Sequence, residues 1–293
     1  MSDLIQQPPP AGERGRAERR RTLRRRLLLV AAPLLILAVL VPWLALRGPA
    51  RAGALSQDPP QLAVVGRGAA VSPSPAGTLA PLPRPTKSRP LKIYFGGDSL
   101  AGYPCLEFGK LAAASGVMRL KADYVVSSRL CYNVPINWPA RLNAQLRLYH
   151  PAAVVFMIGA NDGGAAITVD GKVYGFWTDA WFTAFRKRVG GMMDAMLHNG
   201  VKRIYWVGMP IMKAGDYPSS DQMRRLNAAY RAEAKLRPAA RYIDIWRLLA
   251  TSAGQWDPRW RASWDPAHLN PAGARRVAVK VMTAIKNDWL PPQ

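Results

Sequence analysis

Hydrophobic and polar residues follow three different patterns along the chain, and the first of them is the most distinct. Residues 27–46 are apolar throughout and carry no charge. A helix of this length, with a rise of about 1.5 Å per residue, would span about 30 Å, the thickness of the hydrocarbon core of a bilayer. Pro33 and Pro42 lie within the segment, and transmembrane helices tolerate proline. The pattern therefore predicts a transmembrane helix over residues 27–46.

The charges before this segment predict its orientation. Residues 1–26 hold eight arginines and three acidic residues. The positive-inside rule keeps such a tail in the cytoplasm and sends the rest of the chain across the membrane. A cleaved signal peptide is the alternative, since Ala50-Arg51-Ala52 resembles a cleavage site. The apolar segment is longer than the usual signal core of about 7–15 residues, which favours an uncleaved anchor.

The second pattern, over residues 47–90, has no apolar periodicity. It contains nine prolines, with alanine, glycine and serine filling about half of the remaining positions. Such a composition cannot bury apolar surface and is typical of an extended, semi-rigid linker. The linker would hold the rest of the chain, residues 91–293, away from the bilayer. That remainder has the size of one ordinary domain.

The third pattern, over residues 91–293, alternates between strand-like and helix-like segments. Strands are expected at residues 92–95, 117–126, 152–158, 203–207 and 241–245. Helices are expected at residues 103–115, 138–149, 177–198 and 219–236, and from residue 271 onward. The continuous apolar run at 152–158 is typical of a strand buried on both faces. Five strands with intervening helices predict an α/β fold with a mostly parallel sheet. Residues 167–174 predict an additional hairpin with an Asp-Gly turn, bordering the cleft.

Composition narrows the classes of function. The net charge is +23, which favours a membrane surface or an acidic polymer as partner. If the domain is exported, it meets no nucleic acid, and general attraction to the membrane surface would account for the charge equally well. Two cysteines and three histidines are too few for a cysteine-rich zinc site or a histidine-rich metal centre.

Three short polar segments follow predicted strands or lie in a late loop: 96–100 (Gly-Gly-Asp-Ser-Leu), 159–162 (Gly-Ala-Asn-Asp) and 265–268 (Asp-Pro-Ala-His). Taken singly, they are typical of a helix cap, a turn and a structural histidine. Their order along the chain suggests that they form one shared site, because polar groups beyond the carboxyl ends of parallel strands meet at one edge of the sheet.

These segments contain the groups that a serine hydrolase needs. Ser99, on a glycine-flanked turn, would be the nucleophile, His268 its base, and Asp265 the acid that orients His268. The Asn161 amide and the Ser99 backbone N–H would bind the oxyanion, and one such donor contributes about 3–4 kcal/mol to the rate. A metal site built from Asp98, Asp162 and Asp265 is a weaker alternative.

The three segments, in this order, resemble the SGNH (GDSL) hydrolase superfamily, and the resemblance covers about residues 91–293. It looks closest to exported, membrane-anchored bacterial members, which implies a single-pass protein of the bacterial inner membrane with its catalytic domain in the periplasm. It further implies a flavodoxin-like three-layer fold, a mechanism without metal or cofactor, and the roles given above to Ser99, His268, Asp265 and Asn161.

The second block of the superfamily departs from the usual pattern. A glycine usually stands there, and its backbone N–H completes the oxyanion hole. Residues 127–130 here read Ser-Ser-Arg-Leu, so Arg129 is the candidate donor. We also expect a Cys105–Cys131 disulfide, because both cysteines follow strand ends and the periplasm is oxidising. A loop of about 26 residues closed in this way would stabilise the fold by about 3 kcal/mol and hold the second block in place. Two buried free thiols are the alternative.

The predicted function follows from the site and the location. Trp256, Trp260 and Trp264 precede the Asp265–His268 segment and would stack on sugars, although tryptophans more often fill cores. We expect a serine esterase or acyltransferase acting on O-acyl groups, O-acetyl above all, of an envelope or secreted polysaccharide through an acyl-serine intermediate. The alternatives are a lipid esterase or lysophospholipase and a non-catalytic glycan-binding scaffold.

Overall fold

The computed structural model describes residues 81–133, 135–162, 164–216 and 218–291. The basic tail at 1–26, the predicted transmembrane segment at 27–46 and most of the linker at 47–90 lie outside these residues. Residues 81–90, the described end of the linker, form neither helix nor strand. Within the described ranges, no helix is both long enough and apolar enough to cross a membrane.

The core of the described domain is a five-stranded sheet in which every neighbouring pair of strands is parallel. The strands lie in the order β2-β1-β3-β6-β7. Their bounds are β1 Leu91–Gly97, β2 Met118–Tyr124, β3 Ala153–Met157, β6 Arg203–Val207 and β7 Ala240–Ile243. Every residue of β3 and β6 is buried, as expected for central strands of a parallel sheet. The predicted α/β fold with a parallel sheet is confirmed.

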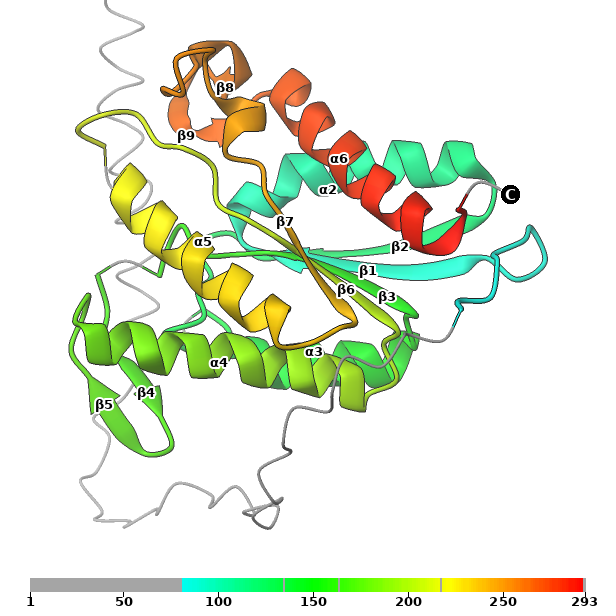
Figure 1. The fold of residues 1–293 in the computed structure, drawn as a ribbon, viewed down its shortest axis with the longest axis horizontal. Coiled ribbons are helices and arrows are strands. Elements are labelled where there is room, and N and C mark those ends of the chain that lie inside the picture. The colour runs from blue at the N-terminus through cyan, green and yellow to red at the C-terminus, as the bar shows by residue number, and fades with distance from the viewer. Residues whose placement is uncertain (1–80, 134, 163, 217, 292–293) are drawn as a thin grey trace, which may run out of the picture. The chain divides into compact units, whose positions relative to one another are not determined.

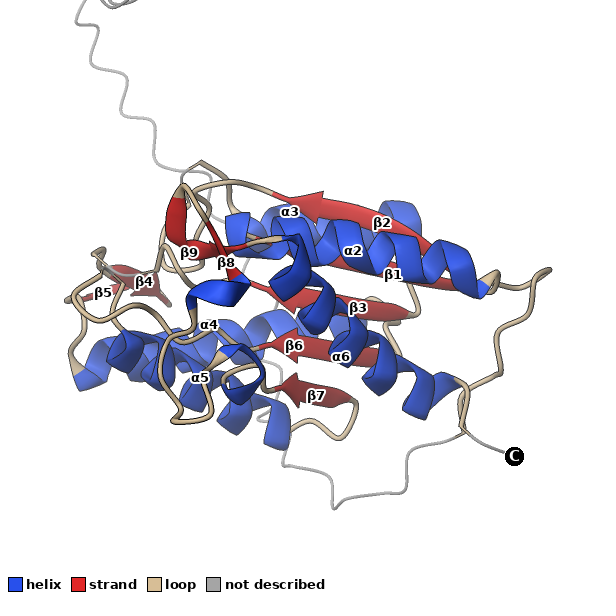
Figure 2. Ribbon diagram, turned by 90° about the horizontal axis from the view of Figure 1, so that it is seen from above, coloured by secondary structure: helices blue, strands red, loops and turns tan. Residues whose placement is uncertain are grey.

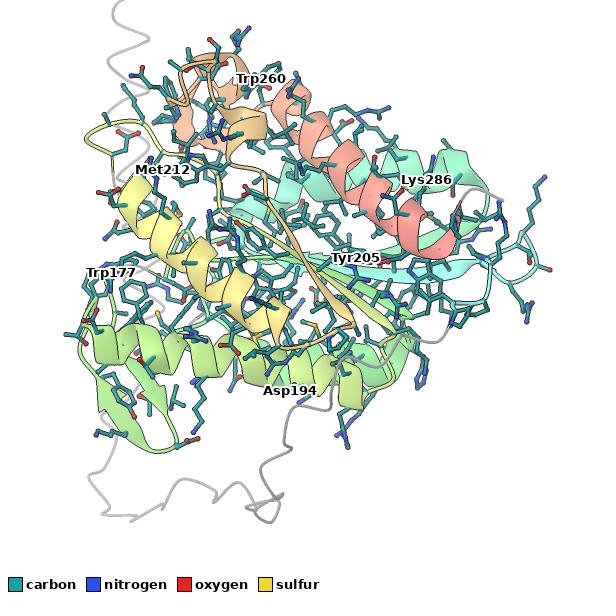
Figure 3. All side chains as sticks on the ribbon, viewed as in Figure 1. Trp177, Asp194, Tyr205, Met212, Trp260 and Lys286 are labelled. Carbon is teal, nitrogen blue, oxygen red and sulfur yellow. The ribbon has the colours of Figure 1, made fainter. Side chains whose placement is uncertain are left out.

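Helices cover both faces of this sheet and produce three layers (Figures 1 and 2). One face carries α2 and α6, and the other carries α3, α4 and α5. Their bounds are α2 Ser99–Ser115, α3 Trp138–Tyr149, α4 Asp179–His198, α5 Ser220–Lys235 and α6 Pro271–Trp289. Aromatic side chains fill the space between the layers (Figure 3). The rings of Trp138 and Phe156, for example, meet edge to face with their centroids 5.1 Å apart.

The helix ends follow local sequence signals, with one exception. Ser219 and Gln222 form a capping box at α5, and the Asn270 side chain caps α6. Helix α2 was expected to begin after Tyr103 but begins at Ser99, because the Asp98 side chain accepts a hydrogen bond from the Leu100 N–H and caps the earlier turn. The helix therefore starts directly at the predicted nucleophile.

Two small hairpins lie near the carboxyl ends of the main strands (Figure 2). The predicted one consists of β4 Ile167–Val169 and β5 Lys172–Tyr174, and both turn residues between them have positive φ, as an Asp-Gly turn requires. The other, β8 Arg261–Ala262 and β9 Asp265–Leu269, was not predicted. Two short 3₁₀ helices, Arg247–Leu249 and Pro258–Trp260, precede it. Strand β9 carries the Asp-Pro-Ala-His segment.

Candidate active site

The turn that carries Ser99 and the turn after β3 each contain a glycine whose surroundings leave no room for a side chain. Gly97 has φ +152°, and a Cβ there would lie 1.8 Å from the carbonyl oxygen of Met157. Gly159, at the end of β3, has φ +147°, and a Cβ there would lie 2.3 Å from the Tyr230 hydroxyl. Only glycine fits at both places. The main chains after β1 and β3 can therefore approach each other closely beneath Ser99, which is half-buried at the first position of α2.

Asp98 links the ends of these two strands. Its side chain is fully buried, and one oxygen accepts a hydrogen bond from the Leu100 N–H at 2.8 Å. The other oxygen accepts from the N–H groups of Gly159 and Ala160 at 2.9 and 3.2 Å. Burial raises the pKa of Asp98 to about 6, although these N–H groups and the nearby His268 act to lower it. Asp98 is therefore a structural clamp between the serine turn and the loop that carries Asn161.

Asn161 lies against the second block, as an oxyanion-hole residue should. Its side-chain Nδ2 donates a hydrogen bond to the carbonyl oxygen of Ser128 at 3.0 Å. This bond uses one of the two amide hydrogens and fixes the plane of the amide, so the other hydrogen can serve an incoming oxyanion. Ser128 is itself held by its hydroxyl, which accepts from the indole N–H of Trp138 at 2.9 Å and donates to the Val125 carbonyl at 2.7 Å.

The second block turns without a glycine. Ser127 takes the left-handed conformation itself, with φ +60°. Within the described part of the chain, the backbone N–H of Arg129 has no hydrogen-bond partner, and neither does that of Ser99. These two N–H groups and the second Asn161 amide hydrogen are the free donors near the serine turn. The Arg129 N–H is therefore available for the role predicted for it. The bond from Asn161 to the Ser128 carbonyl places the peptide next to Arg129 beside the Asn161 amide.

Asp162, which the sequence offered only as a turn residue or as a ligand of the weaker metal-site alternative, holds the far side of the second block. It is fully buried, and one carboxylate oxygen accepts from the N–H groups of Leu130 and Cys131, at 2.6 Å each. The other oxygen is buried without a hydrogen-bond partner among the described residues. Burial raises the pKa of Asp162 to about 7. Two buried aspartates thus fix the loops on both sides of the oxyanion donors.

His268 and Asp265 face each other across the last segment. Nδ1 of His268 lies 3.1 Å from Oδ2 of Asp265, within ion-pair distance, and has no hydrogen-bond partner among the described residues. The other Asp265 oxygen accepts from the Ala267 N–H at 2.6 Å, which shapes the loop. Burial acts to raise the pKa of Asp265, but the Ala267 N–H and His268 outweigh it, so the pKa lies below its ordinary value. An ionised Asp265 beside Nδ1 leaves Nε2 of His268 for proton transfer.

The three candidate sugar-binding tryptophans differ in their surroundings. Trp264 is 65% exposed, and its ring centroid lies 5.0 Å from that of His268. Trp256 donates its indole N–H to the Pro266 carbonyl at 3.2 Å, beside the catalytic pair. Trp260 instead lies under the guanidinium of Arg276, at 4.4 Å from its ring centroid. Trp264 and Trp256 therefore border the candidate site, whereas Trp260 packs against α6.

The predicted disulfide is wrong in this structure, because Cys105 and Cys131 are both free and buried. Cys105 lies on the buried face of α2, and burial, aided by the charge of Asp123 on β2, raises its thiol pKa to about 12. Cys131 instead lies beside Asp162, with its Sγ 3.5 Å from that residue's carbonyl oxygen. The two thiols lie in separate surroundings. The second block, which the disulfide was expected to hold in place, is held instead by hydrogen bonds to the Asp162 carboxylate.

Arg261 is a further residue that the sequence did not indicate. It is 5% exposed and forms no ion pair among the described residues. Its guanidinium donates to the carbonyl oxygens of Ala267 at 3.3 Å and of Ile211 at 2.5 Å. Arg261 therefore ties the catalytic loop to the loop that follows β6. A buried arginine bonded only to main-chain carbonyls leaves no sequence motif.

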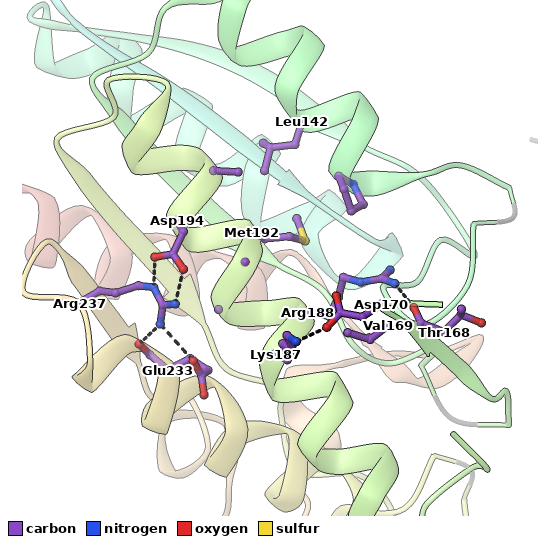
Figure 4. Close-up of a pocket in the computed structure, with 14 residues that line it drawn as sticks. Leu142, Thr168, Val169, Asp170, Lys187, Arg188, Met192, Asp194, Glu233 and Arg237 are labelled. Atoms are coloured by element: carbon purple, nitrogen blue, oxygen red, sulfur yellow. Dashed lines mark hydrogen bonds and ion pairs between the residues drawn. The ribbon is translucent and has the colours of Figure 1, made fainter. Parts of the chain in front are cut away.

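One large cavity lies on the α4 side of the second block, and Arg188 in its lining donates to the Leu130 carbonyl at 2.8 Å. It has a volume of about 560 Å³ and follows α4, where Arg237 pairs with Asp194 and Glu233 (Figure 4). The β4–β5 hairpin borders it through Asp170, which pairs with Lys187. No residue predicted for catalysis lines this cavity. The hairpin is thus anchored on α4.

The fold and the site together define the class of protein. A serine after the first strand, an asparagine after the third and a late Asp-Pro-Ala-His segment, on a parallel sheet of order β2-β1-β3-β6-β7, are the features of the SGNH (GDSL) hydrolase superfamily, and the resemblance noted in the sequence is confirmed. The chain belongs to the family described as "Protein of unknown function (DUF459)", whose model matches residues 92–284.

Solved structures share the fold at low sequence identity. LAE5, an alpha/beta hydrolase enzyme from the metagenome of Lake Arreo in Spain, is 17% identical with a TM-score of 0.51, covering 66% of this chain and 94% of its own. Axe2, an acetylxylan esterase from Geobacillus stearothermophilus, is 16% identical with a TM-score of 0.51, covering 69% of this chain and 97% of its own. No curated protein matches the chain.

Proposed function

We propose that this protein is a serine esterase that removes O-acyl groups, O-acetyl above all, from an envelope or secreted polysaccharide. The observation that carries the proposal is the 3.1 Å contact between His268 and Asp265 at the sheet edge where Ser99 begins α2. The free backbone N–H groups of Ser99 and Arg129 and the amide of Asn161 support it from the other side.

The proposed chemistry has two steps. In the first, Oγ of Ser99 attacks the ester carbonyl while Nε2 of His268 accepts its proton, and the donors around Asn161 bind the developing oxyanion. The sugar hydroxyl leaves with that proton, which yields an acyl-Ser99 ester. In the second, water attacks this ester, His268 again takes and returns a proton, and the free acid departs. Asp265 stabilises the imidazolium in both steps.

A carbohydrate substrate is supported by two features. The exposed ring of Trp264 beside His268 offers a flat face of the kind on which sugars stack. Axe2, whose fold is similar, is an acetylxylan esterase. A sugar hydroxyl in place of water in the second step would make the protein an acyltransferase. Hydrolysis is our first choice, because the triad needs nothing further for it.

We also propose that residues 27–46 anchor the protein in the bacterial inner membrane and that residues 91–293 work in the periplasm. The support is the uncharged apolar segment after an arginine-rich tail. Alkaline phosphatase fused after residue 90 should be active in whole cells. Activity only after cell lysis would contradict the proposed orientation.

The test of the esterase proposal is covalent labelling. A fluorophosphonate should modify Ser99, located by mass spectrometry, and p-nitrophenyl acetate should be hydrolysed. The Ser99→Ala variant should lose both properties, whereas Ser252→Ala, at an exposed loop serine, should keep both. A wild-type protein that is neither labelled nor active on p-nitrophenyl acetate would instead favour the scaffold.

A second experiment separates hydrolysis from transfer. The protein is mixed with an acetyl donor and acceptor oligosaccharides, and free acetate and acetylated sugar are both measured. Free acetate as the main product supports the esterase, and acetylated sugar as the main product supports the acyltransferase. Efficient cleavage of lysophospholipid with no effect of any glycan would overturn the carbohydrate assignment.

A further inference from the structure

A second cavity lies beside the candidate active site, beyond the carboxyl ends of β6 and β7. It has a volume of about 600 Å³, and its lining includes Met212, Lys213, Gly215, Ser219, Arg224 and Trp256. In Figure 1 the loop from β6 to α5 runs toward β9, and the Arg261 bond to Ile211 joins the two. None of the residues that we assign to catalysis lines the cavity, so its function is separate from the chemistry at Ser99.

The cavity touches the catalytic loop through one side chain. The indole N–H of Trp256 donates to the Pro266 carbonyl, between Asp265 and His268. One edge of this ring is thus fixed to the loop that carries the base, while the residue lines the cavity. A sugar stacked on Trp256 would therefore lie next to the sugar whose ester is cleaved.

The walls of the cavity are held by hydrogen bonds. The Met212 N–H donates to the Ser220 hydroxyl, which donates in turn to the Met212 carbonyl, both at 2.9 Å. Arg261 holds the adjacent Ile211 carbonyl. On the other side, the Thr251 N–H donates to the Gln255 carbonyl at 2.8 Å and closes the turn before Trp256. The cavity is therefore formed before any ligand binds, which lowers the entropy cost of binding.

The charge balance of the cavity is positive. Arg224 lies 3.5 Å from the carboxylate of Asp221 and stacks on Trp246, so it is already partnered. Lys213 forms no ion pair within the described part of the chain, and its ammonium lies 6.0 Å from the centre of the Trp256 ring. An unpaired ammonium above an aromatic face can bind a ligand that has an apolar ring face and a negative charge on its rim.

We propose that this cavity is a subsite for a carboxylate-bearing sugar, a uronic acid unit of the polysaccharide. The ring of Trp256 would bind the sugar face and Lys213 its carboxylate. The inference rests on the proposed function and deepens it, because it makes an acidic polysaccharide the substrate. Residues 91–293 hold 27 lysines and arginines against 14 aspartates and glutamates, and this net charge of +13 would also steer such a polymer toward the domain.

Activity on a matched pair of polymers tests the subsite. The probes are acetylated polygalacturonate, which is acidic, and acetylated xylan, which is neutral. We expect a higher kcat/KM on the acidic polymer, and Lys213→Gln should lower the ratio of acidic to neutral kcat/KM by about tenfold. Trp256→Ala should raise KM for both polymers, and Trp256→Phe should restore part of the loss. Lys202→Gln, at an exposed lysine before β6, is the matched control and should leave the ratio unchanged.

A binding measurement separates this proposal from the esterase proposal. De-esterified oligogalacturonate is titrated calorimetrically into full-length Ser99→Ala protein, with and without Lys213→Gln. Binding that weakens about tenfold in the double variant supports the subsite, even if the wild type proves inactive on every ester. Equal binding by both proteins would overturn the subsite while leaving esterase activity on p-nitrophenyl acetate intact. Competition by glycerol phosphate at lower concentration than by galacturonate would overturn the uronic acid in favour of a phosphate ligand.

Discussion

The two halves of the candidate site use aspartates in opposite ways. On the nucleophile side, after β1 and β3, Asp98 and Asp162 are fully buried and accept hydrogen bonds from main-chain N–H groups. On the base side, on β9, the Asp265 side chain is 32% exposed and faces an imidazole. One residue type therefore serves as a structural clamp in one half and as the proposed catalytic partner of His268 in the other.

The electrostatics of the two halves differ accordingly. Burial raises the pKa of Asp98 and Asp162, to about 6 and about 7. At Asp265 burial also acts to raise the pKa, but the backbone N–H groups of Ala267 and His268 and the charge of the imidazole together outweigh it and bring the pKa below its ordinary value. An aspartate that must stabilise an imidazolium has to remain ionised, and one that clamps a loop need not. Exposure to solvent on the base side makes this possible.

The largest effect should follow from Asp265→Asn, which keeps the shape of the side chain but removes its charge. We expect kcat on p-nitrophenyl acetate to fall by about 10⁴-fold, because the imidazolium loses its counter-charge and its preferred tautomer. The melting temperature should change little, since the residue is partly exposed. Steady-state kinetics and thermal unfolding check both expectations.

A loss of stability comparable to the loss of activity would contradict this division, because it would make Asp265 a clamp like Asp98. Asp257→Asn is the matched control on the same side. That carboxylate pairs with Arg259 and caps the short helix Pro258–Trp260, so its replacement should cost stability and leave kcat largely intact.

The next effect should follow from Asn161→Ala, on the nucleophile side. Removal of one oxyanion donor costs about 10²–10³-fold in kcat. The variant also loses the bond to the Ser128 carbonyl, so part of the loss should come from misplacement of Arg129. Asn161→Asp keeps the size of the side chain but replaces the donating amide by an acceptor-only carboxylate, so it should be at least as impaired. Activity of either variant within threefold of the wild type would remove Asn161 from the oxyanion hole.

The sequence predicted the sheet well because buried parallel strands leave continuous apolar runs, as at residues 152–158. It predicted the ends of α5 and α6 because caps are local signals. It placed the start of α2 too late, since a proline at residue 104 suggests a first turn, and the capping bond of Asp98 becomes visible only in three dimensions. The two-residue strand β8 is too short to leave any periodicity.

The site was predictable only as far as its motifs are contiguous. Ser99, Asn161 and His268 stand in short segments whose order along the chain is itself a signal. The clamp made by Asp162 and the tie made by Arg261 join residues distant in sequence, and their partners are main-chain atoms, which carry no sequence identity. The disulfide was expected because both cysteines follow strand ends and the periplasm is oxidising, whereas the packing of Cys105 on the inner face of α2 decided the outcome.

A smaller effect, on stability, should follow from Asp162→Ala. The N–H groups of Leu130 and Cys131 would lose their acceptor in a buried place, and an unsatisfied buried group costs about 1–3 kcal/mol. We expect a loss of about 3 kcal/mol in the free energy of unfolding, measured with urea. Asp170→Ala, at the exposed turn of the hairpin, is the control and should cost less than about 1 kcal/mol. Equal losses would show that Asp162 is no clamp.

The smallest effect concerns pH and distinguishes the buried aspartates from Asp265 once more. Because the pKa of Asp162 is about 7 in the folded protein and ordinary in the unfolded chain, the folded state holds a proton that the unfolded state has lost between about pH 4 and 7. Stability from this group is therefore highest below pH 4 and falls as the pH rises to 7. Asp98 contributes with the same sign up to about pH 6, whereas the lowered pKa of Asp265 acts in the opposite sense, at lower pH.

Urea unfolding of the wild type and of Asp162→Asn at pH 4.5, 6 and 7.5 isolates the contribution of Asp162. The wild type should lose about 2–3 kcal/mol relative to the variant across this range, on a scale where one pKa unit corresponds to about 1.4 kcal/mol. A difference that stays constant or grows with pH would mean that Asp162 is ionised throughout, and Arg188, whose charge acts on Asp162, would then be the cation that keeps it so.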